Sequence, residues 1–159
     1  MAITTDLITG FPGETEAEFQ DSLEFVRSQH FAGGHVFTYS ARAGTAAASM
    51  PDQVRSTVRK ERNAQMRAVF QQSAMDYQTQ FLGRELEVLW ESAKAMGPTT
   101  WTLSGLTDNY LRVTTEAPQS YWNQITPVRL TEITDHGFWG VFAGQGPDEL
   151  PVWFQADPG

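Results

Sequence analysis

The chain has 159 residues, no cysteine and a formal net charge of −8 at pH 7. This length fits one domain or two small ones, and a content of 40% hydrophobic and 12% aromatic residues predicts a packed globule. The absence of cysteine excludes disulfides, thiolate nucleophiles and a cysteine-ligated iron–sulfur cluster held by this chain alone. No apolar run approaches the roughly 18 residues of a membrane-spanning helix, and no signal-peptide pattern opens the sequence. We therefore expect a cytoplasmic protein with no membrane partner.

Charge is distributed unevenly along the chain. Residues 51–84 carry six basic against three acidic residues, whereas residues 85–159 carry three basic against ten acidic ones. Strong binding to phosphate needs clustered lysine and arginine. Only the middle segment offers such a cluster, so we expect this chain to supply a modest part of any attraction to nucleic acid.

The first elements predicted along the chain form a β–α–β unit. Residues 3–9 are typical of a short strand, and the glycines and proline of residues 10–13 predict a tight turn after it. Thr15 and Glu18 have the spacing of a capping box, which predicts a helix over about 15–29. A second strand follows at 35–39. Two strands joined through a helix predict a parallel pair with a right-handed crossover.

The pattern changes after an irregular stretch over residues 40–52. Pro51 and Asp52 predict the start of a long helix over about 52–80, with Gly83 at its end. Alternating apolar residues then predict short strands over 86–90, 110–114 and 128–133. Turns are expected at residues 97–98, 105, 108–109 and 135–137. These elements predict a small antiparallel β-barrel, hence an α+β chain with domains at 1–81 and 82–145 and a tail at 146–159. Val152, Trp153 and Phe154 of that tail are expected to dock.

The predicted first domain is incomplete. Two parallel strands and two helices are too few to make a sheet with both faces covered. We expect the first 80 residues to be the end of a larger α/β domain, present here as an excised fragment or in a truncated protein. An open sheet edge is a template for pairing, so self-association through this edge is a further expectation.

Three ordered motifs resemble the radical-SAM methylthiotransferase family. Residues 5–15, TDLITGFPGET, resemble its TDxIxGFPGET segment, and residues 35–47, HVFTYSARAGTAA, resemble its FxYSxRxGTxAA strand and loop. Residues 50–54, MPDQV, and 58–62, VRKER, are similar to its MPDQV…VKKER helix. Residues 82–143 then resemble the TRAM domain of the family, with Thr107–Tyr110 at its TxNY motif. The resemblance covers about residues 3–143.

This resemblance implies the end of a partial TIM-type radical-SAM barrel followed by an OB-like TRAM barrel. The family inserts sulfur and a methyl group into an adenine C–H bond, using S-adenosylmethionine and two 4Fe-4S clusters. His35, Val36 and Phe37 favour the branch acting on threonylcarbamoyl-adenosine at position 37 of tRNA, with the isopentenyl-adenosine branch as the near alternative. Because the cluster cysteines are missing here, the resemblance implies an inactive C-terminal portion whose partners are the N-terminal part of the enzyme and the tRNA anticodon loop.

Candidate cofactor-binding residues lie where the two parallel strands end, because parallel sheets place ligands at their carboxyl edge. Free amides at the start of the following helix would favour polar or anionic groups there. The alternatives are that the glycines and proline only turn the chain, that Tyr39 packs, and that Arg42 forms an ion pair. The general radical-SAM pattern GxIxGxxE is met only in part, since Asp6 stands at its first glycine and Gly13 at its glutamate. The candidates are Gly10, Phe11, Pro12, Gly13, Tyr39, Ser40 and Arg42.

Candidate RNA-binding residues fall in two groups. Arg55, Arg59, Lys60, Arg62 and Arg67 lie on the long helix and would contact phosphates, the alternative being a solvated helix surface. Asn109, Tyr110 and Arg112 in the barrel would stack on or hydrogen-bond an unpaired base, the alternative for Tyr110 being core packing. The histidines are isolated, so no metal site is expected. A stand-alone RNA-binding adaptor without catalysis is the alternative function.

Overall fold

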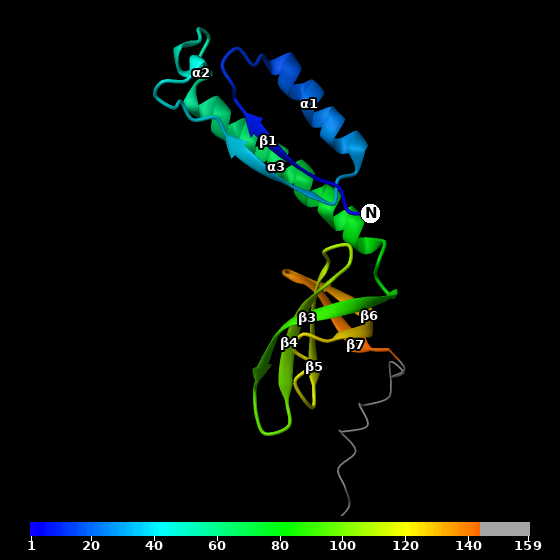
Figure 1. Cartoon of the computed structure of the whole chain (residues 1–159). Helices are drawn as coiled ribbons and strands as arrows, with labels where there is room; N and C mark the ends of the chain where they lie inside the picture. Colours follow the sequence, from blue (N-terminus) through cyan, green and yellow to red (C-terminus); the bar gives the residue numbers. More distant parts are fainter. Residues whose placement is uncertain (144–159) are drawn as a thin grey trace, which may run out of the picture. The chain divides into compact units, whose positions relative to one another are not determined.

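The computed structural model describes residues 1–143, which form two compact units dividing between Tyr77 and Gln78 (Figure 1). The domain bounds inferred from the sequence stay predictions. The expected docking of Val152, Trp153 and Phe154 lies outside the described residues. No helix within residues 1–143 is long and apolar enough to cross a membrane.

The first unit opens with the expected β–α–β arrangement. Strands β1 (Thr4–Thr9) and β2 (Gly33–Thr38) are parallel and are joined by α1 (Glu16–Gln29). The capping box is present: the Thr15 hydroxyl accepts a hydrogen bond from the Glu18 amide at 3.3 Å, and the Glu18 carboxylate accepts one from the Thr15 amide at 2.8 Å. This reciprocal pair satisfies two amides that the first helical turn leaves open.

The long helix begins later than the sequence predicted. A short helix, α2 (Ala46–Ser49), comes first, and α3 runs over Ser56–Thr79. Asp52, the expected start, has a left-handed backbone with φ of 58°, and its carbonyl accepts a hydrogen bond from the Gly13 amide at 3.0 Å. The Asp52 carbonyl is thus hydrogen-bonded to the loop after β1. Because its backbone is left-handed, Asp52 cannot belong to a right-handed helix.

Both long helices of the first unit pack on the same face of its sheet. The side chains of Leu7 and Val36 point to that face and join a core with residues from α1 and α3. The core consists of Phe19, Leu23, Val26, Val36, Met66, Val69 and Phe70, with Leu7 and Phe31 packed against it. On the opposite face Ile8 and Phe37 are paired in register and exposed. Within residues 1–143, helices therefore cover one face of this sheet and leave Ile8 and Phe37 exposed on the other.

The second unit is a closed five-stranded barrel. Its strands are β3 (Glu85–Ala95), β4 (Trp101–Thr107), β5 (Arg112–Ala117), β6 (Ile125–Thr134) and β7 (Gly137–Phe142). They close in the order β3-β4-β5-β7-β6. The prediction of a small, mainly antiparallel barrel is confirmed: the pairs are antiparallel except β5–β7, which is parallel. The result is an OB-like barrel.

Two details of the barrel differ from the sequence prediction. Gly105 was expected in a turn but lies inside β4, where an added Cβ would collide with the Leu89 carbonyl oxygen of the neighbouring strand. Glycine therefore marks a close approach of two backbones at this position. Tyr110 was expected at the start of a strand but lies in the β4–β5 turn. The barrel interior is filled by alternating residues, among them the fully buried Trp90.

Candidate functional site

The loop between β1 and α1 is closed by its own hydrogen bonds. The Gly10 amide donates to a Glu14 carboxylate oxygen at 2.8 Å, and the Gly13 amide donates to the Asp52 carbonyl at 3.0 Å. The Glu14 amide donates to the Phe11 carbonyl at 3.0 Å. The expectation that amides of this loop are free for an anion is therefore wrong for these three residues, because acceptors of the chain already occupy them.

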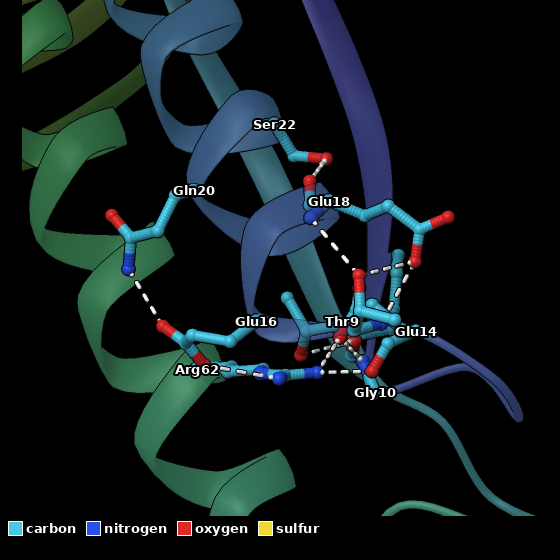
Figure 2. A network of polar contacts seen from close by, with 10 residues as sticks. Thr9, Gly10, Glu14, Glu16, Glu18, Gln20, Ser22 and Arg62 are labelled. Atoms are coloured by element: carbon cyan, nitrogen blue, oxygen red, sulfur yellow. Dashed lines mark hydrogen bonds and ion pairs between the residues drawn. The ribbon is translucent and has the colours of Figure 1, made fainter. Parts of the chain in front are cut away.

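Arg62 of α3 forms hydrogen bonds and ion pairs that hold this loop (Figure 2). Its Nη1 donates to the Glu14 carboxylate at 2.7 Å and to the Glu14 carbonyl at 2.9 Å, and its Nη2 donates to Glu16 at 3.0 Å. The side chain is 6% exposed, and its guanidinium lies over the Phe19 ring at 5.2 Å. A buried guanidinium held by two carboxylates is not available to an RNA phosphate, so its assignment as a phosphate contact does not fit this structure.

The charges in this network stabilise one another. Hydrogen bonds from Gln20 and then Arg62 hold the pKa of Glu16 below its usual value. Burial alone would lower the pKa of Arg62, but hydrogen bonds to Glu14 and Glu16 outweigh it and raise that pKa. The pKa of Glu18 is lowered by hydrogen bonds from the backbone and side chain of Thr15. All three groups are therefore held in their charged forms.

Arg59 of α3 is hydrogen-bonded to the backbone at the end of β2. Its Nη1 donates to the Tyr39 carbonyl at 2.8 Å, and its guanidinium lies 5.9 Å from the centre of the Tyr39 ring. Its side chain also fills the space beside Gly10, where an added Cβ would collide with it. Together, Arg59 and Arg62 bind the carboxyl ends of β1 and β2 to α3. We call these two arginines the arginine clamp.

The predicted cofactor-binding residues gather around this clamp. The Phe11 and Tyr39 rings meet edge to face, with centroids 5.3 Å apart, and Pro12 is buried beside them in the loop. Tyr39 is buried, and its hydroxyl is enclosed without a hydrogen-bond partner among the described residues. A buried polar atom without a partner is uncommon in folded proteins and needs an explanation. Phe11, Tyr39 and the ends of both strands therefore form the part of this unit that best fits a ligand.

The remaining members of the predicted cofactor and helix groups are exposed. Ser40 and Arg42 follow β2, and Arg42 forms no ion pair within residues 1–143, contrary to the alternative considered for it. Arg55 precedes α3 and Lys60 lies in its second turn, both with exposed side chains. These two cations, unlike the arginine clamp, remain available at the surface.

The barrel residues lie together on the β4–β5 hairpin. The Thr107 hydroxyl donates to the Asn109 side chain at 2.6 Å and accepts from the Leu111 amide at 2.9 Å, which closes the turn. Tyr110 sits at the tip with a left-handed backbone, φ of 62°, and is 79% exposed, so the alternative of core packing does not hold. Arg112 Nη1 reaches Ser104 Oγ at 3.3 Å and Glu91 at 3.6 Å. The hairpin thus presents an aromatic ring and a half-exposed guanidinium.

The sequence-based candidates missed the carboxylate partners of Arg62. Glu14 and Glu16 lie 48 and 46 residues away from it, so no local spacing could have paired them. The acid-rich start of α1 and the basic helix at 55–67 were the only signal of their attraction.

The donor set does not fit an iron–sulfur cluster. The sequence has no cysteine, and residues 1–143 contain no group of three or more histidine or carboxylate side chains placed to hold a metal ion. Cluster ligation relies on thiolates. No step of chemistry is therefore assigned to a cluster on this chain.

Curated relatives match most of the chain. It is 38% identical over 130 residues to the threonylcarbamoyladenosine tRNA methylthiotransferase MtaB of Bacillus subtilis, and 39% identical over 136 residues to the tRNA-2-methylthio-N(6)-dimethylallyladenosine synthase of Acidothermus cellulolyticus. These matches cover 82% and 85% of this chain. The chain belongs to the tRNA methylthiotransferase family. It corresponds to the C-terminal part of these methylthiotransferases, as the sequence motifs indicated.

The chain spans less than a third of the length of these two methylthiotransferases, 29% and 27%. A third methylthiotransferase, the dimethylallyladenosine synthase of Methylacidiphilum infernorum, is 32% identical over 149 residues, covering 94% of this chain and 32% of the relative. No family model matches. Methylthiotransferases with both substrate names match at similar identity, so the comparisons do not separate the two branches.

Proposed function

We propose that this chain is the C-terminal portion of an enzyme that 2-methylthiolates a hypermodified adenosine at position 37 of tRNA. The observation that carries the proposal is the match of 82% to 94% of the chain to relatives named for that modification. Within such an enzyme the first unit contributes part of the wall around cofactor and target base. The barrel contributes contacts to the anticodon loop.

Residues at the ends of β1 and β2 are suited to the cofactor wall. S-adenosylmethionine, when bound, supplies the radical and the methyl group of the family's reaction. Phe11 offers a partly exposed ring that packs on the buried Tyr39, and the enclosed Tyr39 hydroxyl is a donor without a partner among the described residues. The arginine clamp holds both strand ends, so these groups are positioned before a ligand arrives. Gly10, Pro12 and Gly13 shape the loop, and Ser40 and Arg42 add polar groups beside it.

The barrel hairpin is suited to an unpaired base. Tyr110 exposes its ring at the tip of a turn closed by Thr107 and Asn109, and Arg112 lies on the adjoining strand. Unstacked bases of RNA loops bind to proteins by stacking on such rings and on guanidinium groups. The exposed Arg55 and Lys60 would hold phosphates without reading sequence.

The chain by itself is proposed to be inactive, because it offers no thiolate for either cluster. The second candidate function is that of a stand-alone RNA-binding adaptor. The lack of cysteine and the exposed ring on the β4–β5 hairpin favour it.

Binding and product formation by the chain alone test the RNA-binding part. An anticodon stem-loop is titrated at several salt concentrations, and the recovered RNA is analysed by mass spectrometry for added sulfur and methyl. We expect salt-dependent binding without product. Absence of binding at low salt would contradict the RNA role, and a methylthiolated product would contradict the proposed inactivity.

A further inference from the structure

A groove runs along the free edge of β2 in the first unit. It has a volume of about 380 Å³ and lies between residues 33–37 of β2 and one side of α3. From α3 it is lined by Arg67, Phe70, Gln71 and Ala74. Within residues 1–143, β2 pairs with β1 alone, so its other edge has no strand beside it. An unpaired edge presents backbone donors and acceptors, of which the Val36 carbonyl already accepts a hydrogen bond from Asn63 Nδ2 of α3 at 3.2 Å.

Two polar side chains of this groove, those of Arg67 and Gln71, are uncommitted. Within the described part of the chain, neither the Arg67 guanidinium nor the Gln71 amide forms a hydrogen bond or ion pair. Both are exposed, unlike the buried Arg62, which lies five residues before Arg67. No residue lining the groove carries a carboxylate. The groove therefore combines a free cation and a free amide, and the carboxylate nearest in contact, Asp6, does not line it but is paired with the lining His35.

An aromatic rim borders the groove on the strand side. Phe37 is 52% exposed, and the His35 ring lies 6.3 Å from it. The Asp6 carboxylate lies 3.0 Å from His35 Nδ1 on the neighbouring strand, and both side chains are exposed. An exposed ring and a free guanidinium that line one groove are the combination that single-stranded nucleic acids bind by stacking and phosphate contact.

A second cavity in the same unit lacks this combination. It lies between α1 and α3, has a volume of about 500 Å³ and is lined by residues that include Arg27, Asp76 and Ser73. Asp76 brings a negative charge, Ser73 already donates to the Phe31 carbonyl at 2.8 Å, and no phenylalanine, tyrosine or tryptophan lines it. Charge and ring content therefore favour the groove at the β2 edge for an anionic, base-bearing ligand.

We propose that the β2-edge groove is a binding subsite for one nucleotide of single-stranded RNA, with its phosphate at Arg67 and its base against Phe37. This proposal rests on the proposed RNA-directed function, which makes an anionic polynucleotide the partner at hand. An extended peptide could also pair with an open strand edge. The free guanidinium and the absence of lining carboxylates favour the nucleotide.

The subsite is tested on the 159-residue chain with adenosine monophosphate as the probe. NMR follows the backbone amides of Gly33 and Gly34, which line the groove. We expect the nucleotide to shift both amides in the original chain and in Arg27→Gln, the matched control in the other cavity, but not in Arg67→Gln. With a single-stranded adenosine oligonucleotide, Arg67→Gln should lower the salt dependence of binding by about 0.7 in slope. Phe37→Ala should weaken binding about tenfold.

Three results would overturn the subsite. The first is no shift of Gly33 or Gly34, and the second is an equal shift in Arg67→Gln. The third is a shift produced by an extended valine-rich peptide but not by the nucleotide, which would assign the edge to strand addition. Stem-loop binding without any nucleotide response at Gly33 and Gly34 rejects the subsite and leaves the proposed function standing. A nucleotide response without stem-loop binding rejects the role of the barrel instead.

Discussion

Arg62 shows how burial changes the meaning of a basic residue. On the sequence it belongs to a row of cations suited to phosphates, yet its side chain is 6% exposed and bound to Glu14 and Glu16. Removing one partner of a buried ion pair leaves the other charge uncompensated. Its role in the protein is therefore to hold the loop that follows β1.

Arg62→Gln should destabilise the first unit by about 3 kcal/mol, because it leaves the half-buried Glu14 carboxylate without its cation. Denaturation followed by far-UV circular dichroism measures this, since the helices α1 and α3 lie almost wholly in that unit. Lys60→Gln, an exposed neighbour on α3, is the control and should change stability by less than about 0.5 kcal/mol. Equal effects of the two substitutions would contradict a clamping role.

Alanine substitutions at Gly10 and Gly13, compared with each other, test the packing of Arg59 against the loop. Both have left-handed backbones, with φ of 73° and 85°, but only at Gly10 would a Cβ meet the Arg59 side chain. Gly13→Ala should cost about 1 kcal/mol from backbone strain. Gly10→Ala should cost more, because Arg59 must also move away from Tyr39. If thermal denaturation gives the two variants the same stability, Arg59 does not pack tightly on the loop.

The acidic start of α1 predicts a loss of stability in acid. The pKa of Glu18 is lowered in the folded chain, chiefly by the backbone of Thr15, so its charged form stabilises the fold above the usual value of 4.5. This contribution disappears as pH falls through the lowered pKa. Glu18→Gln should therefore flatten the dependence of stability on pH below 4.5. A denaturation series at stepped pH checks this, and an unchanged profile would contradict it.

At the scale of elements, a substitution at the tip of the β4–β5 hairpin should change RNA binding without changing the stability of the barrel. Tyr110 has a left-handed backbone that glycine adopts without strain, so Tyr110→Gly should keep the barrel folded while removing the exposed ring. We expect stem-loop binding to weaken about tenfold. Tyr110→Phe retains the ring and should bind as the original chain does. Unchanged affinity in Tyr110→Gly would exclude stacking at this turn.

Local patterns predicted some elements well and others poorly, for physical reasons. The capping box placed the start of α1, because a cap involves residues three apart in sequence. The start of α3 was misplaced, since Asp52 is held by Gly13 from a distant loop. Gly105 was taken for a turn because only the approach of a neighbouring strand reveals why it stands within β4. The burial of Arg62 depended on partners in another helix and could not be inferred from spacing.

At the scale of the whole molecule, the two units can be followed separately in one sample. All five tryptophans lie at residue 90 or later in the sequence, so tryptophan fluorescence does not report the first unit, whereas the helical signal does. The motifs of both units resemble the same family, and membership of that family is confirmed by a relative that matches 82% of the chain. The cysteine-free composition leaves no thiolate on this chain to ligate a cluster.

The most direct test of the central claim is a chimera. The matching 130 residues of the Bacillus subtilis methylthiotransferase are replaced by those of this chain, and tRNA from cells that lack that enzyme is analysed by mass spectrometry. We predict that the chimera restores 2-methylthio-modified adenosine and that Arg62→Gln in it lowers the yield. A folded chimera with its clusters in place that leaves the tRNA unmodified would contradict the account.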